Sequence, residues 1–457
     1  MTSPSNLRNR NSKQVSNDNS GKTQTPRRKS SVKSGGLPKG LKLSFICLII
    51  SVLMLLVVFG FYVDHILFSF GFQDQQYAVV IDAGSTGSRV LCYKFHKNFS
   101  NGKLVLDDEL FKERKPGLSS FADNPTKGAH SIKLLLDEAK AFIPRNKWSD
   151  TPLVLKATAG LRLLPAKKAE HLLAAVRDLF AKSEFSIDET AVEIMDGTDE
   201  GIFSWFTVNF LLKKLSHSTQ AAALDLGGGS TQVTFSTTDP QQVPTYEKYI
   251  HTVHTLNKDV NVFTNSYLGL GLMAGRHAVF TKGYKPNDVV LESECVNPII
   301  KNKTFIYANV KYDISGESSS SLTEENPIVN FDKCLNSVKS IVIPLVRPKP
   351  LTLKQNTIAA FSYYFERAIE SGLIDPFEGG EILIKDYRQK AKEVCATANA
   401  DQPFMCFDLT FISTLLHEGF GLSETKKVKL YKKIDNHEIS WALGCAYNIL
   451  TSDERFK

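Results

Sequence analysis

Outside its first 42 residues, this chain of 457 residues has almost no net charge. Residues 1–42 hold ten Lys and Arg residues and one acid, so they carry +9, and the remainder carries −2 of the formal net charge of +7. A slightly acidic body presents no broad basic surface, so we expect no nucleic-acid partner. The Ser-, Asn- and Lys-rich segment 1–42 is typical of a disordered tail.

Long hydrophobic runs are equally scarce, because the chain has only one, Leu43–Val63, which holds no charged residue. A run of this length predicts a membrane-spanning helix, and a cleaved signal peptide is disfavoured because no Ala-x-Ala site follows. Lys39 and Lys42 precede the run and Asp64 follows it. This asymmetry predicts a cytosolic tail and a body that is lumenal or extracellular.

Cysteines in Cys-x-x-Cys spacing are absent, which excludes the zinc sites built on that pattern. Cys295, Cys334, Cys395 and Cys406 form two sequence-local pairs, and four cysteines allow three pairings. We favour Cys295–Cys334, which encloses a Ser-rich insertion, and Cys395–Cys406, which encloses a short polar loop; four free thiols are the alternative. The sequons at Asn98 and Asn302 predict glycosylation and support a lumenal body only weakly.

Strands alternate with helices from about residue 76, which indicates an α/β protein, although Thr357–Ser371 reads as one helix. Ile81–Val90 and Leu224–Val233 share one pattern: an apolar strand, an Asp, a Gly/Ser/Thr loop and a second strand. This duplication predicts two related lobes that face each other across a cleft. The expected order is a tail at 1–42, a membrane helix at 43–63, a stalk at 64–75, lobe I at 76–220 with a returning helix at 440–457, and lobe II at 221–439.

The two duplicated loops, 83–88 and 226–231, have the composition of phosphate-binding turns, because small residues expose backbone N–H groups and hydroxyls to an anion. Asp82 and Asp225 end the preceding strands, where they could share one Mg²⁺ or Ca²⁺. Each loop could instead be only a tight hairpin turn. The predicted phosphate-binding residues are Gly84, Ser85, Thr86, Gly87, Arg89, Gly227, Gly228 and Gly229.

Glu200 falls in the first turn of a helix expected over Thr198–Lys213, with Thr198 as its N-cap. The helix dipole favours an ionised carboxylate there even without a function. As a catalytic residue, Glu200 would deprotonate an attacking water, with nearby phosphate charge raising its pKa. Thr158 could contact phosphate or metal-bound water, and Arg162 could bind phosphate or form a structural ion pair.

Five segments, in order, resemble the conserved regions of the ectonucleoside triphosphate diphosphohydrolase (apyrase) family. They are DAGSTGSR at 82–89, ATAGLRLL at 157–164, DGTDEGIFSW at 196–205, LDLGGGSTQVTF at 224–235 and ISWALGCAYN at 439–448. The resemblance implies an actin/hexokinase-like fold of two ribonuclease-H-like lobes with an interlobe active site. It also implies cation-dependent, in-line attack of water on a terminal phosphate without a phosphoenzyme.

The same resemblance assigns roles to single residues of this chain. It implies that Glu200 is the base and that Ser230 holds the attacking water. Asp82 and Asp225 correspond to the carboxylates that hold the cation through water. The further positions around the cation and its waters are Thr158, Gln232 and Trp441.

One N-terminal span and Arg89 resemble the short Golgi/ER or secreted members, which prefer nucleoside diphosphates such as UDP and GDP and clear them during glycosylation. This implies a single-pass enzyme with a lumenal catalytic domain, expected to be monomeric and in some members cleaved from its anchor. The alternatives are a broad apyrase acting on extracellular ATP and ADP, and a non-catalytic nucleotide-binding protein of the same superfold. Gly229 replaces an Ala that is frequent in the family, which we expect to be harmless, and Tyr267 is a candidate contact for the base.

Overall fold

The computed structural model describes residues 39–69, 75–98, 101–237, 244–255, 258–317, 328–376 and 379–452. It divides into two compact units, residues 1–65 and 66–457. Nearly all of the predicted tail at 1–42 therefore lies outside the described residues. The predicted stalk at 64–75 contains the end of a helix and the first residue of a strand.

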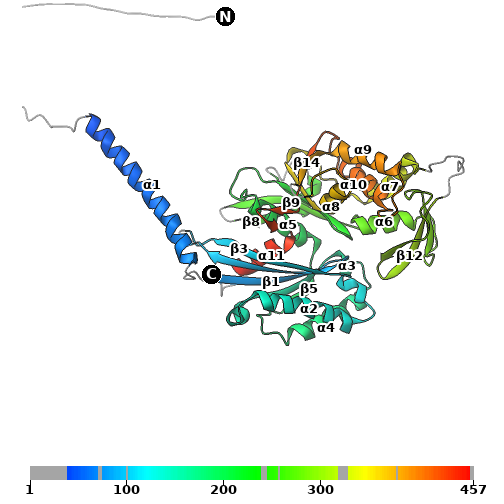
Figure 1. Ribbon diagram of the computed structural model, residues 1–457, viewed down its shortest axis with the longest axis horizontal. Helices are drawn as coiled ribbons and strands as arrows, with labels where there is room; N and C mark the ends of the chain where they lie inside the picture. The colour runs from blue at the N-terminus through cyan, green and yellow to red at the C-terminus, as the bar shows by residue number, and fades with distance from the viewer. Residues whose placement is uncertain are drawn as a thin grey trace, which may run out of the picture. The chain divides into compact units, whose positions relative to one another are not determined.

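Helix α1 (Lys39–Ser69) contains the uncharged segment 43–63 (Figure 1). The described large apolar side chains between Phe45 and Tyr62 are exposed. In the part of the chain that the structure describes, no helix is long and apolar enough to cross a membrane. The membrane span therefore stays a prediction.

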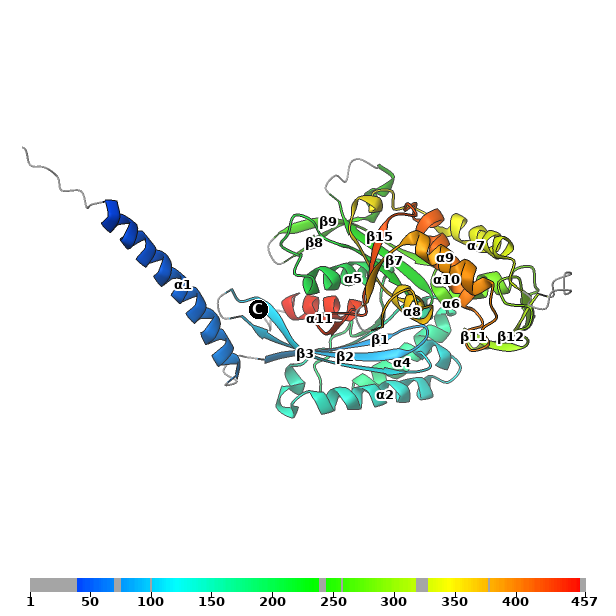
Figure 2. The same cartoon turned by 45° about the horizontal axis from the view of Figure 1, so that its top comes forward.

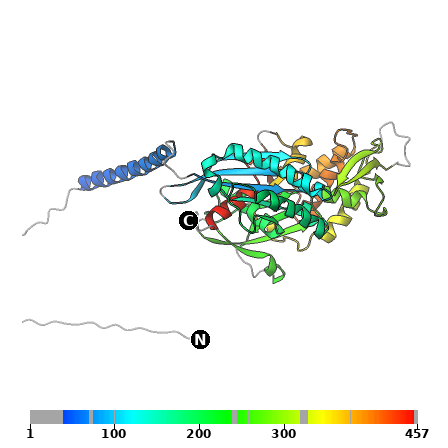
Figure 3. The ribbon, with the colours of Figure 1, turned by 90° about the horizontal axis from the view of Figure 1, so that it is seen from below.

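A five-stranded sheet forms the first lobe, in the order β3-β2-β1-β4-β5. Strands β1, β2 and β3 are antiparallel neighbours, whereas β1, β4 and β5 run parallel. Helices α2 and α4 pack together on this sheet, as can be followed in Figure 3. The bounds are β1 (Gln75–Ala83), β2 (Ser88–Lys97), β3 (Leu104–Arg114), β4 (Leu153–Ala157), β5 (Val192–Ile194), α2 (Pro125–Phe142), α3 (Ala159–Arg162) and α4 (Ala166–Phe180).

A seven-stranded sheet forms the second lobe, in the order β14-β15-β13-β6-β7-β9-β8. Its five inner strands, β9-β7-β6-β13-β15, repeat the order and the directions of the whole first sheet. The duplication predicted from the two loop motifs is therefore confirmed at the level of topology. The bounds are β6 (Ala222–Leu226), β7 (Ser230–Ser236), β8 (Ile250–His254), β9 (Asp259–Leu268), β13 (Ile358–Ser362), β14 (Gly380–Leu383) and β15 (Lys427–Leu430).

Helices α5 (Gly197–Leu211) and α11 (Trp441–Ser452) pack against each other between the two sheets (Figures 1 and 2). Helix α11 lies on β1 and β2, and α5 lies on β6, β7 and β9. The Thr207 hydroxyl donates to the Ser440 carbonyl at 2.9 Å and accepts from the Gly444 N–H at 2.9 Å. The C-terminal helix thus returns to the first sheet and links it to α5.

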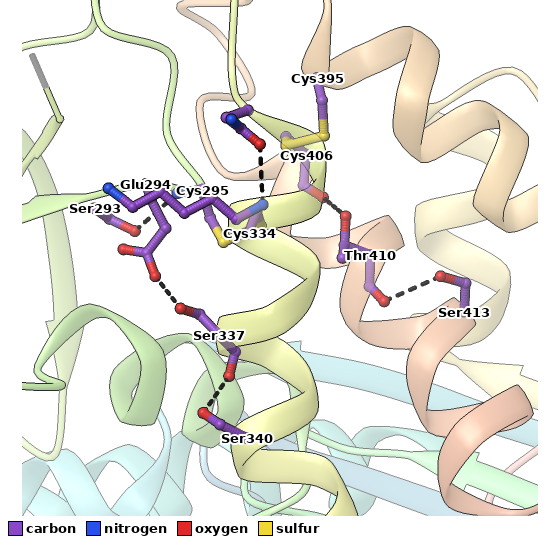
Figure 4. Close-up of a disulfide and its surroundings, with 12 residues drawn as sticks. Ser293, Glu294, Cys295, Cys334, Ser337, Ser340, Cys395, Cys406, Thr410 and Ser413 are labelled. Carbon is purple, nitrogen blue, oxygen red and sulfur yellow. Dashed lines mark hydrogen bonds between the residues drawn. A yellow bond between two sulfur atoms is a disulfide. The ribbon is translucent and has the colours of Figure 1, made fainter. Parts of the chain in front are cut away.

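The opposite side of the second lobe carries helices and a small sheet of order β10-β12-β11. Both predicted disulfides, Cys295–Cys334 and Cys395–Cys406, are present (Figure 4). The remaining elements are α6 (Leu272–Phe280), α7 (Phe331–Leu345), α8 (Tyr363–Glu370), α9 (Ile384–Cys395), α10 (Met405–Thr414), β10 (Val290–Ser293), β11 (Lys303–Tyr307), β12 (Val310–Gly316), β16 (Lys433–Ile434) and β17 (His437–Glu438).

Two local predictions were wrong. The segment 357–371 is not one helix, because Ile358–Ser362 forms the buried central strand β13 and only Tyr363–Glu370 is helical. The helix that carries Glu200 is capped by Asp196 rather than Thr198, since the Asp196 side chain accepts from the Thr198 N–H at 2.7 Å. In the first case, burial between two parallel strands outweighed a sequence that is compatible with a helix.

Candidate functional site

Both predicted phosphate loops are short hairpin connections, 84–87 between β1 and β2 and 227–229 between β6 and β7. The hairpin and phosphate-binding interpretations are therefore compatible. The register is also duplicated, because Asp82 pairs with Arg89 across the first hairpin and Asp225 pairs with Gln232 across the second. Arg89 and Gln232 thus occupy equivalent positions beside the two carboxylates.

The two loops lie against each other. A Cβ added to Gly228 would collide with the Ser85 hydroxyl and come within 3.0 Å of the Thr86 methyl carbon. A Cβ on Gly229 would lie 2.8 Å from the Cβ of Ala159. Glycine at these two positions therefore permits a close approach of the lobes that any larger residue would prevent.

Asp82 and Asp225 are both buried, with 7% and 8% of their surface exposed. The Oδ1 atom of each carboxylate has no hydrogen-bond partner. Burial raises the pKa of Asp225 to about 6, and the charge of Asp82 adds to that rise. Burial also raises the pKa of Asp82, against the opposing effect of Arg89, whose Nη1 lies 3.3 Å from Asp82 Oδ2. Two buried carboxylates with free oxygens fit a divalent cation, whose charge would offset their desolvation.

No group of three or more His, Cys, Asp or Glu side chains suited to a metal occurs among the described residues. The fit is thus to a cation held by two carboxylates and water, not to one enclosed by protein ligands. Thr158 is buried next to Asp82, because its N–H donates to the Ala83 carbonyl at 3.4 Å. Trp441 is buried at the start of α11, and the described contacts do not join it to Asp82 or Asp225.

Glu200 lies in the first turn of α5 with 6% of its surface exposed. Burial raises its pKa to about 8, and the carboxylates of Asp225 and Asp82 add to the effect, while Arg162 opposes it. Burial is thus the main cause of the raised pKa, which lies in the range that suits a general base near neutral pH.

Arg162 forms an ion pair with Glu200. Of the two roles considered for Arg162 from the sequence, phosphate binding and a structural ion pair, the structure shows the ion pair. Its Nη1 also donates to the Ser266 hydroxyl at 3.4 Å. The Gln232 amide donates to the same hydroxyl at 2.8 Å and to the Ser230 hydroxyl at 2.9 Å. One continuous polar network therefore connects Glu200 with Ser230, the two residues predicted to act on the attacking water.

Three further residues lie near the site or were expected to. Tyr267 does not suit contact with a nucleotide base, because it is buried, packs against Phe420 and donates its hydroxyl to the Pro348 carbonyl at 2.6 Å. Ser266 and Ser362, which lies beside Asp225, were missed from the sequence. Neither belongs to a recognisable motif, and Ser362 fell within a segment assigned to a helix.

The predicted glycosylation sites differ in setting. Asn302 is exposed just before β11, at a positive φ of 51°. Asn98 is half-buried, and the rest of its sequon lies outside the described residues. The structure thus leaves Asn302 the more accessible acceptor.

Known proteins resemble this chain over most of its length. The model of the GDA1/CD39 (nucleoside phosphatase) family matches residues 71–456. Nucleoside diphosphate phosphatase ENTPD5 of Homo sapiens is 39% identical over 389 residues, which cover 82% of this chain and 88% of that protein. Ectonucleoside triphosphate diphosphohydrolase 6 of Mus musculus is 41% identical over 394 residues, which cover 83% of each chain.

A solved structure of nucleoside triphosphate hydrolases from Neospora caninum superposes with a TM-score of 0.58 at 14% identity. The match covers 84% of this chain and 93% of that chain. At this identity the likeness establishes a shared fold of two mixed α/β lobes.

Proposed function

Since this chain belongs to the GDA1/CD39 (nucleoside phosphatase) family, we propose that it is an apyrase-type nucleoside-diphosphate phosphohydrolase. The single observation that carries the chemistry is the buried Glu200, joined through Arg162, Ser266 and Gln232 to Ser230. A binding protein would have no need of a carboxylate whose pKa burial raises to about 8 beside the phosphate loops.

In the proposed reaction, the Glu200 carboxylate takes a proton from a water that the Ser230 hydroxyl orients. The oxygen of that water bonds to the terminal phosphorus in line with the bridging oxygen. The bond from phosphorus to the bridging oxygen breaks, which releases orthophosphate and a nucleoside monophosphate. Proton transfer to a positioned base contributes about 100- to 10,000-fold in rate.

The proposed cation is Mg²⁺ or Ca²⁺, held by Asp82 and Asp225 through water, with Thr158, Gln232 and Trp441 as further positions around it. The free Oδ1 atoms of both Asp residues support this assignment. When bound, the cation neutralises phosphate charge and polarises the phosphoryl oxygens.

The chain's own loops are proposed to hold the phosphates. The loop 84–87, which supplies the Ser85 and Thr86 hydroxyls, lies against the glycine backbone of 227–229, where Ser85 contacts Gly228. Arg89 is already paired with Asp82 and, at 2.7 Å, with Glu113. We therefore propose two roles for Arg89, which are binding phosphate and orienting Asp82.

We extend the proposal to the subgroup and its location. Preference for diphosphates such as UDP and GDP over triphosphates is supported by the 39% identity to a protein named a nucleoside diphosphate phosphatase. A lumenal catalytic unit in the Golgi or ER is supported by two disulfides and the charge asymmetry around 43–63. We propose a monomer that is anchored by the predicted span 43–63 and glycosylated at Asn302, with Asn98 as a second acceptor.

The test is phosphate release by the purified full-length chain from UDP, GDP, ADP and ATP, each with Mg²⁺, Ca²⁺ or a chelator. We expect release from UDP and GDP that exceeds release from ATP and is lost with the chelator. No release from any nucleotide would reject the proposal. Strong ATP turnover with weak diphosphate turnover would reject the subgroup but retain the hydrolase.

A further inference from the structure

Ser362 has an unusual backbone. Its φ of 57° and ψ of −131° lie in a region that glycine enters readily and L-residues rarely adopt. Several other non-glycine residues with positive φ, such as Ala308 and Asn436, are exposed in short turns. Ser362 is instead half-buried, at the end of the inner strand β13 and directly before helix α8. Such a conformation persists only where the surroundings impose it, and it is typical of functional sites.

The repeated topology places Ser362 at the position in the second lobe that corresponds to the end of β4 in the first lobe. β13 runs parallel to β6, the strand of Asp225, as β4 runs parallel to β1, the strand of Asp82. The register pairs Ser362 with Leu226, and it pairs Ala157 with Ala83. Ser362 is therefore the second-lobe counterpart of the strand end just before Thr158.

Two contacts explain why the chain turns sharply here. The Ser362 side chain lies near the Asp225 carboxyl and counteracts part of the rise that burial causes in the pKa of that carboxyl. The next residue, Tyr363, lies near Thr86 in the phosphate loop of the first lobe, and this neighbour lowers the pKa of its hydroxyl against the effect of burial. The strained turn thus contacts the carboxylate of its own lobe and the loop of the other.

Glycine would adopt this conformation at no steric cost, so the presence of serine indicates that its hydroxyl is used. We propose that Ser362 is a positioning residue that fixes the orientation of Asp225 for cation binding, as Arg89 does for Asp82. The inference rests on the proposed function. Hydrogen-bond partners of metal-binding side chains govern metal affinity, and their loss weakens it by about 10- to 100-fold.

The test compares Ser362→Gly with Ser362→Ala in the full-length chain. Ca²⁺ is titrated at a fixed concentration of α,β-methylene-UDP, and the thermal shift gives its half-saturating concentration. Both variants lose the hydroxyl, so both should need about 10-fold more Ca²⁺ or higher. Ser362→Gly should nevertheless have the higher cation-free Tm, because it relieves the strain that Ser362→Ala retains. With UDP as substrate, saturating Ca²⁺ should restore most of kcat.

Ala308→Gly is the matched control, since Ala308 also has a positive φ, of 47°, and lies in the β11–β12 turn. It should raise Tm without changing the Ca²⁺ requirement. If Asp225→Asn needed more Ca²⁺ but Ser362→Gly needed only as much as the wild type, the proposed role of Ser362 would be overturned and the cation site would stand. An unchanged Ca²⁺ response in Asp225→Asn would overturn both this inference and the proposed cation site.

Discussion

The two hairpins of the site share a sequence pattern and a register but hold their carboxylates differently. Asp82 is paired with Arg89, which lies directly across its own hairpin. Asp225 faces Gln232 at the equivalent position, and Gln232 binds Ser230 and Ser266 instead. The side chain that stabilises the Asp225 carboxylate is that of Ser362, which lies on a separate strand. The cross-strand partner in the second hairpin thus binds Ser230 and Ser266 rather than the carboxylate, and a residue distant in the sequence lies beside the carboxylate instead.

The first prediction removes each carboxylate in turn. Asp82→Asn and Asp225→Asn should each lower kcat/KM for UDP by about 100-fold or more, because a bound cation supplies several kcal/mol of charge stabilisation. In cation-free buffer, Asp225→Asn should raise Tm more than Asp82→Asn does, because only Asp82 has an ion pair to lose. Phosphate release and thermal unfolding provide the two readouts. Equal Tm changes would show that the hairpins hold their carboxylates alike.

The second prediction replaces the residue that lies across the hairpin from each carboxylate. Arg89→Gln should raise the half-saturating Ca²⁺ concentration by about 10-fold while leaving kcat at saturating Ca²⁺ near that of the wild type. Gln232→Leu should instead lower kcat, because it breaks the hydrogen bonds to Ser230 and Ser266. Steady-state kinetics across a Ca²⁺ series distinguish the two patterns. If both variants changed the same parameter, the division of labour between the hairpins would be wrong.

The third prediction concerns pH. Glu200 has a pKa of about 8 when folded and an ordinary value of 4.5, so the folded state holds its proton more tightly than the unfolded state does. Its contribution to stability is complete below about pH 4.5 and is lost as the pH rises through about 8. The Tm of the cation-free protein should therefore fall over this window, and Glu200→Gln should flatten the decline. A decline of wild-type steepness in Glu200→Gln would contradict the burial effect.

The smallest effect is expected where the lobes touch. Gly229→Ala would bring its Cβ to 2.8 Å from that of Ala159. We expect a loss of about 1–3 kcal/mol in the free energy of unfolding, as for other overpacking substitutions. Gly227→Ala is the control, since its Cβ would meet only the Ser230 carbonyl oxygen, at 3.2 Å. Equal denaturant midpoints for the two variants would argue against close packing at Gly229.

Local sequence patterns were sufficient to predict much of this site. The duplicated strand, Asp and Gly-rich loop predicted two lobes, and the structure repeats five strands in the same order. Asp82, Asp225 and Glu200 could be singled out because they sit at fixed offsets from strand ends and a helix start. Ser362 was not found because its role depends on β13 entering the sheet beside β6, which is a long-range pairing. The link from Arg162 to Ser266 likewise joins segments far apart in the chain.

The central claim is that Glu200 is the base of a hydrolytic site, and Glu200→Gln tests it most directly. Phosphate release from UDP at saturating Ca²⁺ should fall by about 100- to 10,000-fold. The thermal shift produced by α,β-methylene-UDP should stay close to that of the wild type, because the phosphate loops and both Asp residues remain. Phosphate release at the wild-type rate with an intact thermal shift would contradict the claim.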